Sequence, residues 1–187
     1  MATEAPAVGG GGLIDRAMRA AKLEAAVYEE VEADSTATTQ AVTIVVIGAV
    51  AAGLAGGLGT ADNLVGGLIG GIISGLLGWA VYAYVAFLVG TKLLAGPQTH
   101  ADWGQVARTL GFANAPRALL VLGMIPALFS IVSFVVGIWV LVTTVFALRA
   151  SLDVSTGRAV AIAIVSVIAL ILVTIVIGGL LAAVIPG

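Results

Sequence analysis

Long stretches without a charged residue are the feature that most constrains this chain. No Asp, Glu, Lys or Arg occurs in residues 41–58, 64–91 or 118–148, or anywhere from residue 159 onward. About 20 apolar residues in a helix are enough to cross the hydrocarbon core of a bilayer. Only 10% of the residues are charged, against roughly 25% in an average soluble domain. The sequence therefore predicts an all-α integral membrane protein.

Turn residues and prolines divide the apolar part of the chain, residues 40–187, into five predicted transmembrane helices. They cover about 41–58, 64–94, 106–125, 128–148 and 159–185. The third and fourth are separated near Gly123 to Pro126, because a proline removes a backbone donor and favours a break. The alternative is a four-span protein in which residues 118–148 form one long, tilted helix.

The positions of the basic residues give this bundle an orientation. In the five-span arrangement one side of the membrane carries every base except Arg117, namely Arg16, Arg19, Lys22, Lys92, Arg108, Arg149 and Arg158. The opposite loops, around Asp62 and Pro126, carry none. Since Lys and Arg accumulate on the cytoplasmic side, we expect a multi-pass protein with a cytoplasmic N-terminus. The composition, rich in Ala, Gly and Val with more Arg than Lys, favours a prokaryotic cytoplasmic membrane.

The first 39 residues differ from the rest, since they hold seven of the ten acids and three of the eight bases. Residues 1–12 are small and Gly-rich, which predicts a disordered tail. Residues 13–39 are interpreted as a short amphipathic helix followed by a solvated acidic linker. Arg16, Arg19 and Lys22 flank the apolar face of that helix and predict contact with an anionic membrane surface. A helix that only caps the bundle fits the pattern equally well.

Small residues recur every four positions in the first two spans. Such spacing places them on one helix face and lets two helix backbones approach closely in lipid. The predicted helix-packing residues are Gly53, Gly57, Gly66, Gly67, Gly70, Gly71, Gly75 and Gly78. Packing of the first span on the second explains them, and so do homo-oligomerisation or a glycine-lined passage.

The third span is the only one with an ionisable residue at depth. Asn114, Pro116 and Arg117 form a candidate intramembrane polar site, because an ionisable group at membrane depth is costly and is a functional candidate by default. The alternative is that Arg117 snorkels to the headgroups from an interfacial kink. No acid lies at a similar depth to pair with Arg117.

Residue types and motifs that are typical of enzymes, metal sites and nucleic-acid binding are scarce. The chain has no cysteine and one histidine, and it shows no nucleophile elbow, phosphate loop or paired carboxylates inside a span. No basic patch with interleaved aromatics suggests nucleic-acid binding. We therefore expect no enzyme activity, no cofactor and no metal, and partners limited to the lipid bilayer, other membrane proteins or a second copy of the chain.

Several segments of the chain together form a recognisable pattern. They are residues 28–34 and 37–41 before the first span, residues 105–113 with Ala115 and Pro116, Trp139, and residues 147–149 and 153–159. With these segments the chain resembles the prokaryotic branch of the Yip family (Ypt/Rab-interacting protein one domain). The family often has Gly-Tyr where this chain has Gly111 and Phe112, so any role of the tyrosine oxygen does not carry over to this chain. The resemblance implies five transmembrane helices, a cytoplasmic N-terminus and a non-enzymatic role.

Eukaryotic members of that family are linked to Rab-type GTPases, vesicle traffic and membrane shaping. For this chain the resemblance implies a scaffold or adaptor that binds other membrane proteins or lipidated proteins, or that influences membrane shape. A small transporter or channel that uses the glycine-rich spans and the region of Asn114 and Arg117 is the alternative hypothesis.

Overall fold

The computed structural model describes residues 11–57 and 64–184, with side-chain surroundings for residues 11–56 and 65–176. Most of the predicted tail, the predicted loop around Asp62 and the last residue of the predicted first and fifth spans lie outside the described residues. The described chain is helical, with no strand in these two ranges. Its elements are α1 (Leu13–Ala21), α2 (Ala25–Ala33), α3 (Ala37–Gly57), α4 (Leu64–Leu88), the π-helical turn η2 (Val89–Leu93), α5 (Trp103–Ala113), the 3₁₀ helix η3 (Ala115–Met124), α6 (Pro126–Ser151) and α7 (Thr156–Val184).

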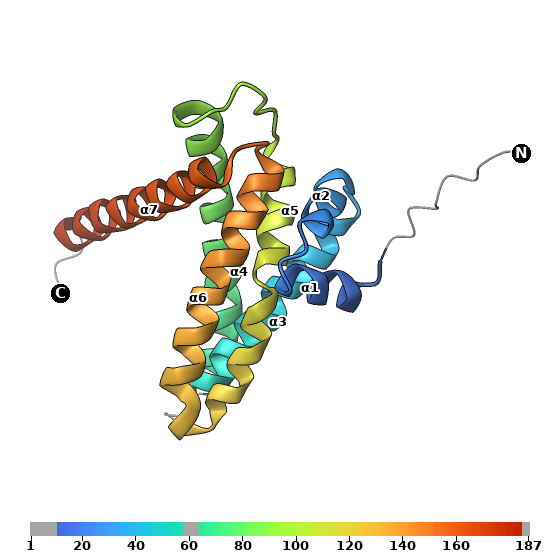
Figure 1. The fold of residues 1–187 in the computed structure, drawn as a ribbon. Helices are drawn as coiled ribbons and strands as arrows, with labels where there is room; N and C mark the ends of the chain where they lie inside the picture. Colours follow the sequence, from blue (N-terminus) through green and yellow to red (C-terminus); the bar gives the residue numbers. More distant parts are fainter. Residues whose placement is uncertain (1–10, 58–63, 185–187) are drawn as a thin grey trace, which may run out of the picture.

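Four described helices are long and apolar enough to cross a membrane. They are Ala37–Gly56, Val65–Leu93, Pro126–Ser151 and Thr156–Val176. These helices overlap the first, second, fourth and fifth predicted spans. The chain is accordingly a multi-pass membrane protein in which α3, α4 and α6 lie side by side with α5 (Figure 1), while α7 runs sideways from the end of the bundle where α6 finishes.

The residues of the predicted third span, 106–125, do not form one continuous helix. The segment forms α5 and then η3, with the change at Asn114 just before Pro116. A proline cannot donate to the helix ladder, so carbonyls near the break need other partners. The Asn114 amide donates to the Leu110 carbonyl at 2.7 Å, and the Thr143 hydroxyl of α6 donates to the Ala113 carbonyl at 2.7 Å.

This broken segment runs beside α3 for most of its length. A Cβ on Gly111 would lie 2.6 Å from the Ala41 Cβ, one on Gly48 would lie 2.8 Å from the Arg117 Cβ, and one on Gly123 would lie 3.2 Å from the Ala55 Cβ. The α3 residues in these three pairs are seven positions apart, about 10 Å along a helix. Residues 111–123 therefore pass from one end of the bundle to the other.

We call the two ends of the bundle the basic end and the far end. The basic end holds the end of α4, the starts of α5 and α7, and the end of α6, with Lys92, Arg108, Arg149 and Arg158. The far end holds the end of α3 and the turn from η3 to α6. At the basic end, α5 begins with a reciprocal cap in which Asp102 accepts from the Gln105 N–H and the Gln105 side chain accepts from the Asp102 N–H.

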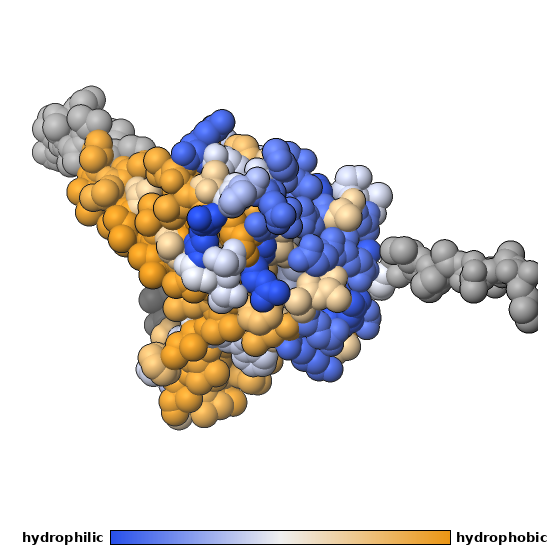
Figure 2. All heavy atoms as spheres, turned by 45° about the horizontal axis from the view of Figure 1, so that its top comes forward, coloured by the Kyte–Doolittle hydropathy of each residue, from blue (hydrophilic) through white to orange (hydrophobic). Residues whose placement is uncertain are grey.

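The N-terminal segment folds as two short helices rather than as one helix and a linker. The chain reverses after α1, where Leu23 has a φ of 65°, and the acidic run then forms α2. Val27, Tyr28 and Val31 are fully buried against the bundle. Figure 2 shows hydrophilic residues gathered on the side of α1 and α2, opposite the hydrophobic surface of α7.

Candidate functional site

Arg16 is the centre of an ion-pair cluster that fixes α1 to the bundle. Its side chain is only 2% exposed. Its Nε lies 2.8 Å from Glu30 Oε1, and its Nη1 lies 2.9 Å from Asp34 Oδ2 and 3.3 Å from Gln40 Oε1. One guanidinium thus joins α1 to α2, to the segment after α2 and to the first turn of α3.

The other two N-terminal cations have different environments. Arg19 pairs with Glu30 at 2.9 Å and with Glu24 at 3.1 Å, whereas Lys22 is exposed. Contact of Arg16, Arg19 and Lys22 with a membrane surface stays a prediction, and only Lys22 has its charge turned outward without an acidic partner among the described residues.

The protonation states of Glu30 and Asp34 stabilise the same ion-pair cluster. Burial raises the pKa of Glu30, but hydrogen bonds donated by Arg16 and Arg19 outweigh burial, so the pKa lies below its ordinary value. For Asp34, hydrogen bonds from Thr36 and Arg16 lower the pKa. Both acids are therefore charged at neutral pH and keep Arg16 neutralised inside the cluster.

Arg108 holds the other side of α2. Its Nε donates to the Val31 carbonyl at 3.2 Å and its Nη2 to the Glu32 carbonyl at 2.6 Å. These carbonyls belong to the last turn of α2, where a cation complements the unpaired acceptors. Gln105 donates to the Glu32 carboxylate at 3.2 Å.

Glu32 itself is in an unfavourable environment for a charge. Burial raises its pKa to about 7, with further contributions from Glu29, Asp153 and Asp102 that exceed the opposing effect of Arg108. The contact between α2 and the bundle therefore contains one carboxyl group that titrates near neutral pH.

A groove with almost entirely apolar walls lies between α1 and the membrane helices. Its volume is about 290 Å³. Residues from α1, α3, η3 and α6 line it, among them Ala17, Met18, Ile47, Leu119 and Trp139. We call it the α1 groove. The Trp139 indole donates to the Ala21 carbonyl at 2.7 Å, which holds the end of α1 beside the groove.

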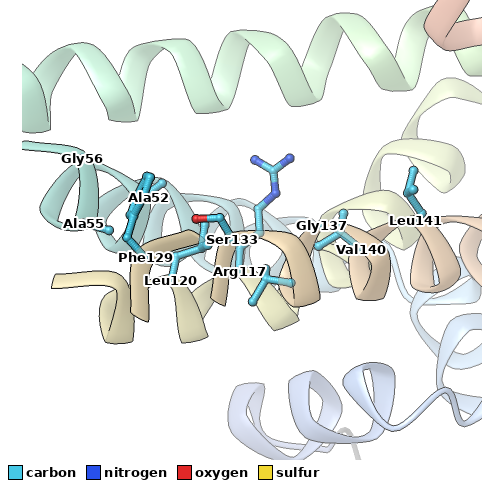
Figure 3. A pocket seen from close by; sticks show the side chains of 11 residues that line it. Ala52, Ala55, Gly56, Arg117, Leu120, Phe129, Ser133, Gly137, Val140 and Leu141 are labelled. Atoms are coloured by element: carbon cyan, nitrogen blue, oxygen red, sulfur yellow. The ribbon is translucent and has the colours of Figure 1, made fainter. Parts of the chain in front are cut away.

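Arg117 lies midway between the two ends of the bundle, at the level of Gly48. Figure 3 shows its guanidinium projecting from η3 toward α4. Among the described residues the guanidinium has neither an ion-pair partner nor a hydrogen-bond acceptor. The other two residues of the predicted polar site are Asn114 and Pro116. The Asn114 amide donates a hydrogen bond to the Leu110 carbonyl of α5, and Pro116 is buried at the start of η3.

Two cavities meet at Arg117, and they share Val140 and Leu141 as well. One, of about 330 Å³, lies toward the basic end, and Ser74, Tyr82, Asn114 and Thr144 also line it. The other, of about 440 Å³, lies toward the far end between α3, η3 and α6 (Figure 3), and its further walls include Ala52, Ala55, Gly56, Leu120, Phe129, Gly137 and the polar residue Ser133. We call them the polar cavity and the apolar cavity.

The small residues of α3 and α4 have different surroundings. A Cβ on Gly71 would lie 3.8 Å from the Gly53 Cα, and one on Gly75 would lie 2.8 Å from the Ala49 Cβ, so this stripe faces α3. Near Gly53 the helices approach at the Gly67 carbonyl. Gly70 and Gly78 have open space around them, and Gly78 lines the polar cavity. Gly66 lies in α4 and Gly57 ends α3.

Sequence reasoning missed the residues that dock the N-terminal helices. Tyr28 is fully buried, and its hydroxyl donates to the Ala20 carbonyl at 2.9 Å. The spacing of Arg16 from Glu30 and Asp34 gives no local signal, because these residues meet only after the turn at Leu23.

No group of three or more His, Cys, Asp or Glu side chains in the described ranges is placed to hold a metal ion.

Comparison with known proteins identifies a family for the chain. No curated protein matches the chain, and no solved structure matches it. The family model described as the Yip1 domain matches residues 24–178, from the start of α2 into the last turns of α7. The chain thus belongs to the Yip1 domain family.

Proposed function

We propose that this protein crosses the membrane five times, with its N-terminus in the cytoplasm. The support is the path of α5 and η3 along α3. Eleven α-helical residues and ten 3₁₀ residues rise about 16 and 20 Å respectively, and their sum exceeds the hydrocarbon thickness of about 30 Å. The basic end then faces the cytoplasm, as the distribution of Lys and Arg favours.

The absence of cysteine from the sequence allows this topology to be tested with single-cysteine variants. Gln98→Cys and Ser155→Cys at the basic end should react with a membrane-impermeant maleimide from one side. Met124→Cys at the far end should react from the other side. Labelling of Gln98→Cys and Met124→Cys from the same side would contradict five spans.

For the role of the protein, we propose a non-enzymatic adaptor that holds the acyl chain of a lipidated protein at the membrane surface. The α1 groove is the observation that carries this proposal. Its apolar walls suit a hydrocarbon chain. Ile14 and Met18 are 72% and 52% exposed on α1, as expected of a helix face that lies against lipid. The exposed cation Lys22 follows α1 and complements an acidic segment next to the acylation site.

The test uses the protein in nanodiscs and a peptide whose palmitoyl chain carries a diazirine. Cross-links should concentrate on Met18 and Leu119. The unacylated peptide should not compete with the acylated one. Ala17→Phe, which fills the groove, should reduce these cross-links, whereas Ala26→Phe on the exposed side of α2 should not. Cross-links spread evenly over the lipid-facing residues of α4 and α6, and unchanged in Ala17→Phe, would refute the adaptor role.

A further inference from the structure

The two cavities at Arg117 contain polar groups that nothing in the described chain satisfies. The Ser74, Tyr82 and Thr144 hydroxyls all border the polar cavity. Among residues 11–57 and 64–184, none of these hydroxyls makes a hydrogen bond, and neither does the Arg117 guanidinium. A charged group at this depth is costly without a partner. The arrangement is therefore incomplete without an anionic group that accepts hydrogen bonds.

The residues that the structure describes do not supply that group. α7 also borders the polar cavity, at Val167, but residues 156–184 contain no acid. A partner's transmembrane helix is too bulky to lie inside either cavity. One turn of a helix, about 10 Å wide and 5.4 Å high, fills roughly 400 Å³, which is as much as the larger cavity holds.

The two cavities differ in chemistry in the way that the two parts of a lipid differ. The hydroxyls of Ser74, Tyr82 and Thr144 lie on the side of Arg117 toward the basic end. The apolar cavity extends from Arg117 toward the far end, and apart from Arg117 the Ser133 side chain is the one polar group in its lining. A phospholipid that enters from the leaflet at the basic end has the same direction, with its headgroup toward that end and its chains toward the far end. It would lie deeper than the other lipids of that leaflet, because Arg117 lies midway between the two ends. α4 and α6 have almost no direct contact within the described residues, so a lipid can enter between them.

We propose that this pair of cavities is a binding site for one anionic phospholipid, with the phosphate against Arg117 and an acyl chain in the apolar cavity. The guanidinium donates two hydrogen bonds to phosphate oxygens, a geometry that arginine favours. Asn114 and the three hydroxyls offer further polar contacts to the headgroup. The site is separate from the α1 groove, which lies on the other side of α3 and η3.

The headgroup half of the site is tested by native mass spectrometry of the delipidated protein. The probes are phosphatidylglycerol and phosphatidylcholine with identical chains. The wild type should retain one phosphatidylglycerol, with about a fivefold preference over phosphatidylcholine. Arg117→Gln should lose this preference, and Arg117→Lys should keep most of it. Arg149→Gln is the matched control, because it removes one exposed cation at the basic end and should leave the preference unchanged.

The chain half is tested with Gly137→Leu. A Cβ on Gly137 meets open space in the apolar cavity, so the larger side chain enters it without a clash. Retention of both lipids should fall by about fivefold or more. The matched control, Gly70→Leu, adds the same side chain at an open position outside the cavities and should bind as the wild type does.

Three results would overturn the proposal. The first is equal retention of phosphatidylglycerol by the wild type and Arg117→Gln. The second is an equal loss of preference in Arg149→Gln, which would mean that the net charge of the basic end attracts the lipid. The third is unchanged binding in Gly137→Leu. None of these measurements uses a lipidated peptide, so the adaptor role can fail without this site and the site without the adaptor role.

Discussion

Replacement of Arg16 by alanine tests whether one buried guanidinium holds the N-terminal helices on the bundle. The substitution leaves Glu30 and Asp34 without the partner that lies 2.8 and 2.9 Å away in the wild type. Breaking a fully buried ion pair costs about 3–5 kcal/mol. The two acid side chains are still 19% and 27% exposed, so water compensates part of the loss and we expect about 2–3 kcal/mol.

This loss should appear as local opening rather than as global unfolding. α1 contacts the bundle through its own face, whereas α3 to α6 keep their contacts with one another. A loss of 2–3 kcal/mol corresponds to roughly 30- to 150-fold more opening of α1. Hydrogen–deuterium exchange of the amides of α1, measured in nanodiscs, should accelerate by that factor, while exchange in α5 and α6 should not change.

Arg19→Ala is the matched control in the same helix. Arg19 is 27% exposed, and it pairs with the 47% exposed Glu24 and shares Glu30 with Arg16, so its loss should cost less than about 1 kcal/mol. Equal acceleration in Arg16→Ala and Arg19→Ala would refute the central position of Arg16. Unchanged exchange in Arg16→Ala would show that Tyr28 and Trp139 alone dock α1.

Three further predictions concern the same packing. Because the pKa of Glu32 is raised to about 7, the folded state favours the protonated form of this side chain. The stabilisation present at acidic pH is therefore lost as the pH rises through 7. The melting temperature should fall from pH 6 to pH 8 in the wild type but not in Glu32→Gln. Gly111→Val should lower the melting temperature by several degrees, because its Cβ would lie 2.6 Å from Ala41 Cβ and overpacking costs about 1–3 kcal/mol. Trp139→Phe removes the hydrogen bond to Ala21, worth about 1 kcal/mol, and should raise exchange in α1 about fivefold.

The long apolar helices could be predicted from the sequence because charged residues or prolines mark the places where the helices end. The predicted fourth span, residues 128–148, is α6 from Pro126 to Ser151. Pro126 starts the helix and Arg149 lies in its last turn. Where a charge or a proline marks each boundary of an apolar run, hydropathy and backbone chemistry agree, and the boundary is known to within a turn.

The N-terminal helices could not be predicted in this way, because their partners are distant in sequence. An acidic run is usually solvated, and the charges of α2 gave no reason to expect otherwise. In the structure Arg16 lies 14 residues before Glu30 and pairs with it, and Arg108 reaches the carbonyls of α2 from 76 and 77 residues away. Only the three-dimensional arrangement turns a polar segment into a docked helix.

The predicted third span shows the limit of reading hydropathy alone. The sequence placed Asn114, Pro116 and Arg117 together, but it gave no means to decide where the helix type changes or where the guanidinium points. Irregular backbone at membrane depth is tolerated only where protein covers it or where it lines a cavity. Both conditions hold here. Thr143 and Asn114 donate hydrogen bonds to carbonyls beside the break, and Arg117 borders two cavities. The proline and the arginine therefore act as one feature, in which the break sets the direction of a charge that a continuous α-helix would place elsewhere.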